Sequence, residues 1–157
     1  MKLEKVYGMI LKERLKEPKE RKLPLSLGRL GEKTAVVLDH IAFLLPECLL
    51  DPGKFAETDV AERLFQEAET DYEPVERVGA VRKIKSSKTG KTLLLRQLEA
   101  GDSRVRVQSK YLQYFEHPEY QIKAPHKPVF VYEDGELCGL VLPVRCPEED
   151  WERGAWQ

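Results

Sequence analysis

The sequence predicts a single α+β domain with an antiparallel sheet in its C-terminal half. Three observations predict it: apolar residues recur every three or four positions over residues 2–16, valines alternate with arginines from Arg104 to Val107, and Asp134-Gly135 separates two apolar runs. The first spacing is that of an amphipathic helix, the second that of a half-buried strand, and Asp-Gly between strands is a strong hairpin signal. The chain has 157 residues, which is enough for one domain with its own core and too few for two of ordinary size.

The N-terminal part, about residues 1–73, is expected to hold most of the helices. Residues 34–38 are rich in strand-forming side chains and predict a strand. Residues 41–50 fit either a helix or a buried strand, because a short apolar run has no decisive period. A second amphipathic helix is predicted over residues 54–69.

The C-terminal part, about residues 77–145, is expected to be mostly strands. Residues 77–84 and 92–98 flank a lysine-rich loop with a late glycine, which predicts a hairpin. A β-α-β-β-β unit follows, with its helix over residues 109–116. Its strands are predicted at residues 104–107, 120–122, 128–132 and 137–144. Residues 146–157 form an acidic tail, in which the run Glu148-Glu149-Asp150 is expected to be solvated.

This C-terminal unit resembles the closing part of the last domain of bacterial DNA sliding clamps. The resemblance covers residues 104–145, about a quarter of the chain. The residues that match the family pattern are, in order, Gln108-Ser109-Lys110-Tyr111-Leu112, Lys127-Pro128-Val129 and Leu142-Pro143-Val144-Arg145. The resemblance implies a sliding-clamp-like domain, with helices toward DNA and sheet on the outside.

The resemblance also implies partners. Sliding clamps encircle duplex DNA, and a cleft near their C-terminus receives short peptides from protein partners. By position, Lys110 would lie on the DNA-facing helix, and Pro143, Val144 and Arg145 would border the peptide cleft. Clamp chains have three such domains and this chain has room for one, so a ring would require a homo-oligomer. Clamp chains also stop just after the matching arginine, whereas this chain continues through Trp151 and Trp156, so its tail could cover the cleft or pack in cis in place of a partner peptide.

Cations gather along the predicted hairpin and the segment that follows it. They are Arg82, Lys83, Lys85, Lys88, Lys91, Arg104, Arg106 and Lys110. Such residues contact phosphates without reading base sequence, and lysines also keep an exposed hairpin soluble. We favour the solubility role and keep DNA binding as the functional alternative, because a net charge of −1 gives no overall attraction for nucleic acid.

Two functional hypotheses follow from these patterns. The first is a non-enzymatic, clamp-related accessory or interaction protein of DNA replication or of a mobile element. The second is a protein-binding module without a nucleic-acid role, which would use the edge formed by Pro143 to Arg145. Its anchors would be an exposed Trp151 or Trp156, since tryptophan and arginine dominate interface energetics.

No pattern points to an enzyme or to a cofactor. Gly90-Lys91-Thr92 imitates the end of a phosphate-binding loop, but position 85 is lysine where that motif requires glycine. The histidines have no nucleophile or carboxylate at a diagnostic spacing.

The cysteines and the apolar runs exclude further classes. Cys48, Cys138 and Cys146 are odd in number and widely spaced, which predicts neither a disulfide framework nor a metal site. Cys48 and Cys138 are expected to be buried apolar groups. No apolar run approaches the length of a membrane span and the N-terminus lacks a signal-peptide pattern, so a cytoplasmic protein with no membrane partner is expected.

Overall fold

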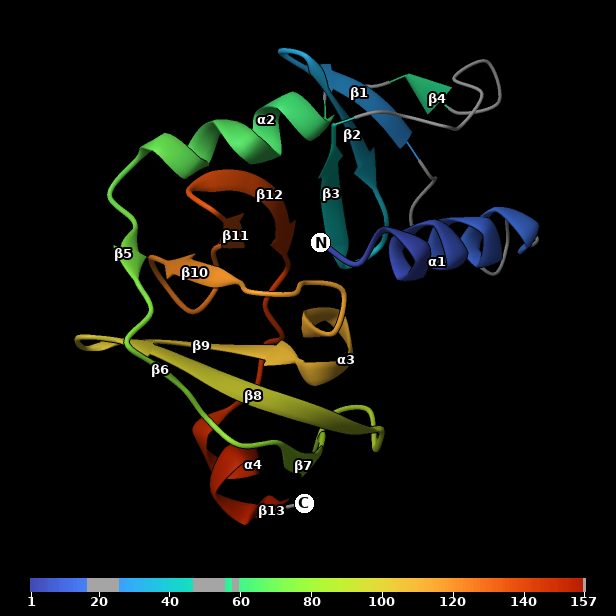
Figure 1. Cartoon of the computed structure of the whole chain (residues 1–157). Helices are drawn as coiled ribbons and strands as arrows, with labels where there is room; N and C mark the ends of the chain where they lie inside the picture. Colours follow the sequence, from blue (N-terminus) through green and yellow to red (C-terminus); the bar gives the residue numbers. More distant parts are fainter. Residues whose placement is uncertain (17–25, 47–55, 58–59, 157) are drawn as a thin grey trace.

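Two sheets and a few short helices make up the protein (Figure 1). The computed structural model describes residues 1–16, 26–46, 56–57 and 60–156. The helices are α1 (Leu3–Leu15), α2 (Val60–Gln66), the 3-10 helix η3 (Glu67–Glu69), α3 (Ser109–Leu112) and α4 (Glu148–Arg153). The strands are β1 (Ser26–Leu30), β2 (Lys33–Val37), β3 (Ile41–Leu45), β4 (Ala56–Glu57), β5 (Glu73–Pro74), β6 (Arg77–Val78), β7 (Arg82–Lys85), β8 (Thr92–Ala100), β9 (Ser103–Gln108), β10 (Glu119–Ile122), β11 (Val129–Glu133), β12 (Glu136–Val141) and β13 (Ala155–Trp156).

The larger sheet combines strands from both halves of the chain. Within the described residues its order is β4-β1-β2-β3-β12-β11-β10-β5. The short β1–β4 pair is parallel, and the other pairs are antiparallel. Strands β3 and β12 join the two halves, with Ala42 opposite Leu140. Residues 1–73, expected to be rich in helices, hold α1, α2 and η3 and also contribute β1 to β4 to the larger sheet.

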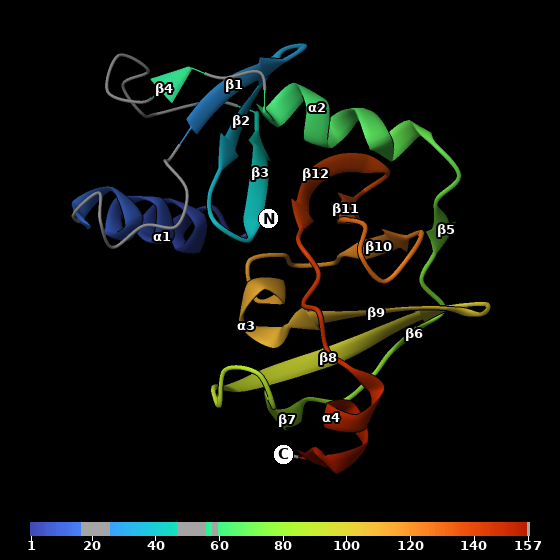
Figure 2. The same cartoon turned by 180° about the vertical axis from the view of Figure 1, so that it is seen from behind.

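Strand β3 shows why residues 41–50 have no clear period. All five residues of the strand are buried, because both faces of the sheet are covered. Phe43 packs in the cluster that contains Val6 of α1, while Leu44 packs in the cluster that contains Phe65 of α2. Helices α1 and α3 thus lie on one face of the larger sheet and α2 on the other, as Figures 1 and 2 show from opposite sides.

The smaller sheet packs beside α3 and carries the end of the chain (Figure 1). Its order is β13-β7-β8-β6, with β9 also paired to β8. Leu98 and Val105 lie on the face of this sheet that packs against the main core. Ile84 and Leu95 lie on its other face and pack against Trp151 of α4. The resulting layers are α2, the larger sheet, the smaller sheet with α3 beside it, and α4 (Figure 1).

Several predictions from local pattern are confirmed. Helix α1 matches residues 2–16, and the hairpin around the lysine-rich loop forms from β7 and β8. The order β9-α3-β10-β11-β12 is the predicted β-α-β-β-β order. However, α3 spans only Ser109–Leu112, and β9 lies in the smaller sheet whereas β10 to β12 lie in the larger one.

Two further predictions differ from the structure. The helix expected over 54–69 begins at Val60, because Ala56 and Glu57 pair with β1. Residues 54, 55, 58 and 59 lie outside the described residues, as does Cys48. The run Glu148-Glu149-Asp150 is solvated only in part: residues 148–153 form α4, on which Glu148 and Glu149 are exposed whereas Asp150 and Trp151 are buried.

Candidate nucleic-acid interface

The loop between β7 and β8 is ordered by hydrogen bonds within itself. Ser86 N–H donates to Lys91 O at 2.9 Å and Gly90 N–H donates to Ser86 O at 2.8 Å. The Ser86 hydroxyl accepts from Thr89 N–H at 3.3 Å. Gly90 has φ +70°, a left-handed conformation that costs glycine little. These local contacts therefore hold the loop backbone in one conformation, which fixes the positions of the Cα atoms of its lysines.

Four lysines of this hairpin are exposed: Lys83, Lys85, Lys88 and Lys91. None of them forms an ion pair within the part of the chain that the structure describes. We call these four side chains the lysine hairpin. The four lysines lie within nine residues of sequence and no acidic side chain of the described residues pairs with them. The surface of the hairpin is therefore locally positive, although the net charge of the whole protein is −1.

Arg82, on the same strand, is engaged inside the protein. Its guanidinium lies 5.0 Å from the ring centroid of Trp151 and 4.8 Å from that of Trp156. It also donates to the carbonyl oxygens of Glu152 and Gly154. These contacts hold the end of the chain against β7 and leave Arg82 poorly placed for phosphate.

Arg106 is engaged even more completely. Its guanidinium donates to Gln97 Oε1 at 2.9 Å, to Cys146 O at 3.0 Å and to Glu148 Oε2 at 2.7 Å. It lies 4.4 Å from the ring centroid of Trp151, and only 9% of the residue is exposed. Arg106 is therefore a support for α4 in this structure.

Arg104 and Lys110 are exposed but separate from the lysine hairpin. Arg104 pairs with Glu99, at the opposite end of β8 from the loop, and its Nε lies 4.0 Å from the Glu99 carboxylate. Lys110 lies on α3 with its ammonium 5.0 Å from the ring centroid of Tyr111. Burial raises the pKa of the Tyr111 hydroxyl to about 12, and Asp39 and Glu13 add to that rise.

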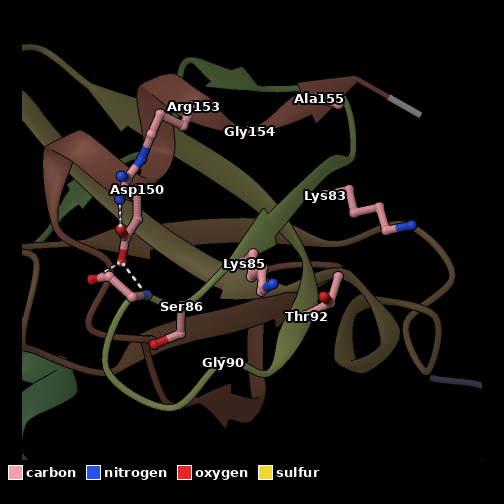
Figure 3. Close-up of a pocket in the computed structure, with 10 residues that line it drawn as sticks. Lys83, Lys85, Ser86, Gly90, Thr92, Asp150, Arg153, Gly154 and Ala155 are labelled. Atoms are coloured by element: carbon pink, nitrogen blue, oxygen red, sulfur yellow. Dashed lines mark hydrogen bonds and ion pairs between the residues drawn. The ribbon is translucent and has the colours of Figure 1, made fainter.

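A pocket of about 570 Å³ opens between the β7–β8 loop and α4 (Figure 3). Its lining includes Lys83, Lys85, Ser86 and Arg153, with Asp150 as an acidic member. Asp150 accepts hydrogen bonds from the Ser87 backbone N–H at 3.2 Å, from the Ser87 hydroxyl at 3.1 Å and from Arg153 at 2.5 Å. The Ser87 backbone bond is the main cause that lowers the pKa of Asp150, and Arg153 lowers it further, so the carboxylate stays charged.

The residues expected to receive a partner peptide lie beside α4. Val144 packs against the cluster of Ile84, Leu95 and Trp151, and its N–H donates to Arg106 O at 2.8 Å. Pro143 is half-buried and Arg145 is exposed. The expectation that Trp151 is exposed is wrong, because only 7% of it is accessible under the Arg82 and Arg106 side chains.

Helix α4 was not predicted from the sequence, although a local signal for it is present. Pro147 precedes Glu148, Glu149 and Asp150, and both proline near a helix start and acids in the first turn favour a helix N-terminus. That signal would have placed Trp151 on a short helix and made it a core candidate. The exposed tryptophan is Trp156, which is 64% accessible.

The described residues were also searched for a metal site, a reactive thiol and a membrane-spanning helix. No group of three His, Cys, Asp or Glu residues there is close enough to hold a metal ion. Burial raises the pKa of the Cys138 thiol to about 12, so this thiol stays protonated. None of the helices in the described ranges is long and apolar enough to cross a membrane.

The chain was compared with protein-family models, curated proteins and solved structures. None of the three comparisons gives a match.

Proposed function

We propose that the protein is a non-enzymatic accessory or interaction protein that binds nucleic acid through the lysine hairpin. The observation that carries this proposal is the exposure of Lys83, Lys85, Lys88 and Lys91 without ion-pair partners among the described residues. Lysines in such a cluster neutralise phosphates and release counterions, which gives sequence-independent affinity. A role in DNA replication or in a mobile element is part of the proposal.

A clamp-related scaffold is also part of the proposal, and an internal repetition supports it. A helix followed by a three-stranded antiparallel meander occurs twice, as α1 with β1-β2-β3 and as α3 with β10-β11-β12. The two meanders meet where β3 pairs with β12, and the two helices lie on the same face of the sheet. This pseudo-symmetry agrees with the resemblance to sliding-clamp domains.

The helix face is a weaker candidate for the DNA contact than the hairpin. Helix α1 mixes exposed Lys5 and Lys12 with Glu4, and Lys110 of α3 is followed by exposed Glu116. Mixed charges of this kind are typical of a solvated helix face. The proposal therefore places the nucleic-acid contact on the lysine hairpin rather than on the helices.

Fluorescence polarisation with a labelled DNA duplex, at low and moderate salt, tests the proposal. The double variant Lys85→Gln/Lys88→Gln should weaken binding and reduce the steepness of its salt dependence by about two, one per lost phosphate contact. The matched variant Lys5→Gln/Lys12→Gln removes the same charge from α1 and should leave the affinity nearly unchanged.

A larger loss of affinity in Lys5→Gln/Lys12→Gln than in Lys85→Gln/Lys88→Gln would place the DNA contact on the clamp-like helix face instead. Equal losses in both variants would show that only net charge matters. Absence of salt-sensitive binding at micromolar protein, together with a monomer by light scattering, would contradict both the nucleic-acid role and the ring.

A protein-binding module without a nucleic-acid role is the second candidate. The exposure of Trp156 at 64% favours it, because an exposed tryptophan beside an arginine is a common interface anchor. The burial of Trp151 weighs against it, since half of the expected anchor is used within the chain.

A further inference from the structure

We infer that the pocket beside the β7–β8 loop binds single-stranded nucleic acid, with a backbone phosphate in the pocket and a neighbouring base stacked on Trp156. The inference rests on the proposed function and adds the state of the strand that is bound. It is carried by the charge of the pocket, by its size and by the position of the exposed tryptophan.

The charge of the pocket suits a phosphate. Lys83 and Lys85 contribute positive charge to its lining, whereas the charge of Arg153 is paired with that of Asp150. Asp150 opposes them, but its carboxylate already accepts hydrogen bonds from Ser87 and Arg153. In the view of Figure 3, Lys85 lies near the centre of the lining, apart from the Asp150–Arg153 pair. The Lys85 ammonium group is thus available to an anion in the pocket, while the Lys83 side chain extends outward from its edge (Figure 3).

The lining also contains neutral hydrogen-bond donors, and at a glycine it lets a ligand approach the backbone closely. Ser86 and Thr92 bring hydroxyl groups, and Gly90 leaves open space where a side chain would lie. A volume of about 570 Å³ lies within the range of small-ligand sites, so the pocket suits a nucleotide-sized group rather than a double helix.

Trp156 lies next to this pocket along β13. Gly154 lines the pocket, Ala155 pairs with Lys83, and Trp156 pairs with Arg82. Trp156 is two residue steps along the extended chain from Gly154, about 7 Å, a distance that one nucleotide spans. The Arg82 guanidinium lies 4.8 Å from the Trp156 ring centroid, which supports the indole while 64% of the residue stays exposed.

This combination favours a single strand over a duplex. Bases within a duplex are stacked on each other and cannot offer a free face to an indole, whereas bases of a single strand can. A basic groove beside an aromatic platform is the general recognition mode for single strands. Because the platform is already held by Arg82, little side-chain freedom remains to be lost on binding.

Fluorescence anisotropy with labelled oligo-deoxythymidine and with a duplex of equal length tests the inference on the full chain. Wild type should bind the single strand more tightly, and Trp156→Ala should lower that affinity about fivefold to a hundredfold, the effect of losing one base stack. Trp156→Phe should retain most of the affinity. Leu15→Ala, at an 85% exposed position on α1, is the matched control and should change nothing.

Each outcome separates this inference from the proposed function. Equal affinity for duplex and single strand, or an unchanged single-strand affinity in folded Trp156→Ala, would overturn the single-strand site while lysine-dependent binding still supports the proposed function. Polyphosphate binding as tightly as the oligonucleotide would also overturn it, because polyphosphate has no bases. No salt-sensitive binding to either form of DNA would overturn both.

Discussion

Two charged side chains at the contact between α4 and the smaller sheet, Arg106 and Asp150, each form several polar contacts. Arg106 donates to three oxygens and lies against Trp151, and Asp150 accepts from Ser87 and Arg153. A buried polar group is costly only when it lacks partners, so these contacts allow a charged arginine and a charged aspartate inside a small core. They also fix the orientation of α4 on the smaller sheet.

Asp150 should make stability depend on acid pH. The folded state lowers its pKa, chiefly through the Ser87 backbone N–H, below the unfolded value of about 3.9. The stabilisation is therefore complete above that unfolded value and is lost as the pH falls through the folded pKa. Urea unfolding from pH 6 down to pH 2 should show a smaller loss of stability in Asp150→Asn than in wild type.

Glu149→Gln is the control for this pH dependence, because Glu149 is the exposed neighbour on the same helix. It should keep the wild-type profile. Parallel profiles for wild type and Asp150→Asn would rule out Asp150 as a source of the acid sensitivity.

At the scale of elements, the pairing of β3 with β12 joins the two halves of the fold. Gly139 of β12 lies opposite Phe43, and Phe115 covers it. A Cβ at position 139 would lie 2.7 Å from Ala42 O and 3.1 Å from Phe115 Cζ. The close approach of the backbone and the aromatic ring thus depends on the absence of a side chain at this position.

Gly139→Ala should therefore destabilise the protein by about 1–3 kcal/mol, the usual cost of overpacking a core. Gly8→Ala is the matched control, since a Cβ there meets nothing within 4 Å and the residue lies in α1. It should stabilise the helix by about 0.5–1 kcal/mol. Urea unfolding of both variants measures the difference, and equal stabilities would show that the β3–β12 contact tolerates a methyl group.

For the whole molecule, the last segment of the chain closes the smaller sheet. Trp151 covers Ile84 and Leu95, and β13 pairs with β7. The same segment carries Asp150 and Arg153 of the pocket as well as Trp156. Stability and the proposed binding site therefore depend on one contiguous stretch, residues 146–156.

Truncation after Arg145 should lower the free energy of unfolding by at least about 3 kcal/mol, the lower end for removing one buried large aromatic side chain. Arg82 and Arg106 would lose carbonyl acceptors in the same change. Truncation after Ala155 removes only Trp156 and the last residue and should cost less than about 1 kcal/mol, the scale of an exposed cation–π contact. Thermal and urea unfolding of both chains measure this, and an unchanged stability after Arg145 would favour a partner-binding tail instead.

The sequence by itself determined the elements whose signals act over a few residues. The three- and four-residue spacing set α1, the glycine-containing loops set the hairpins β7–β8 and β11–β12, and the order β9-α3-β10-β11-β12 followed from alternation and turns. Four lysines of the candidate site were also identified from the sequence, because exposure is the usual state of lysine.

Only the tertiary structure decided what depends on contacts between distant segments. It placed residues 41–45 in a strand covered on both faces, paired β3 with β12, and turned Arg82 and Arg106 inward against Trp151. A tryptophan or an arginine has the same local pattern whether it is exposed or buried. Its environment is set by residues far away in the chain, and those cannot be read from its sequence neighbours.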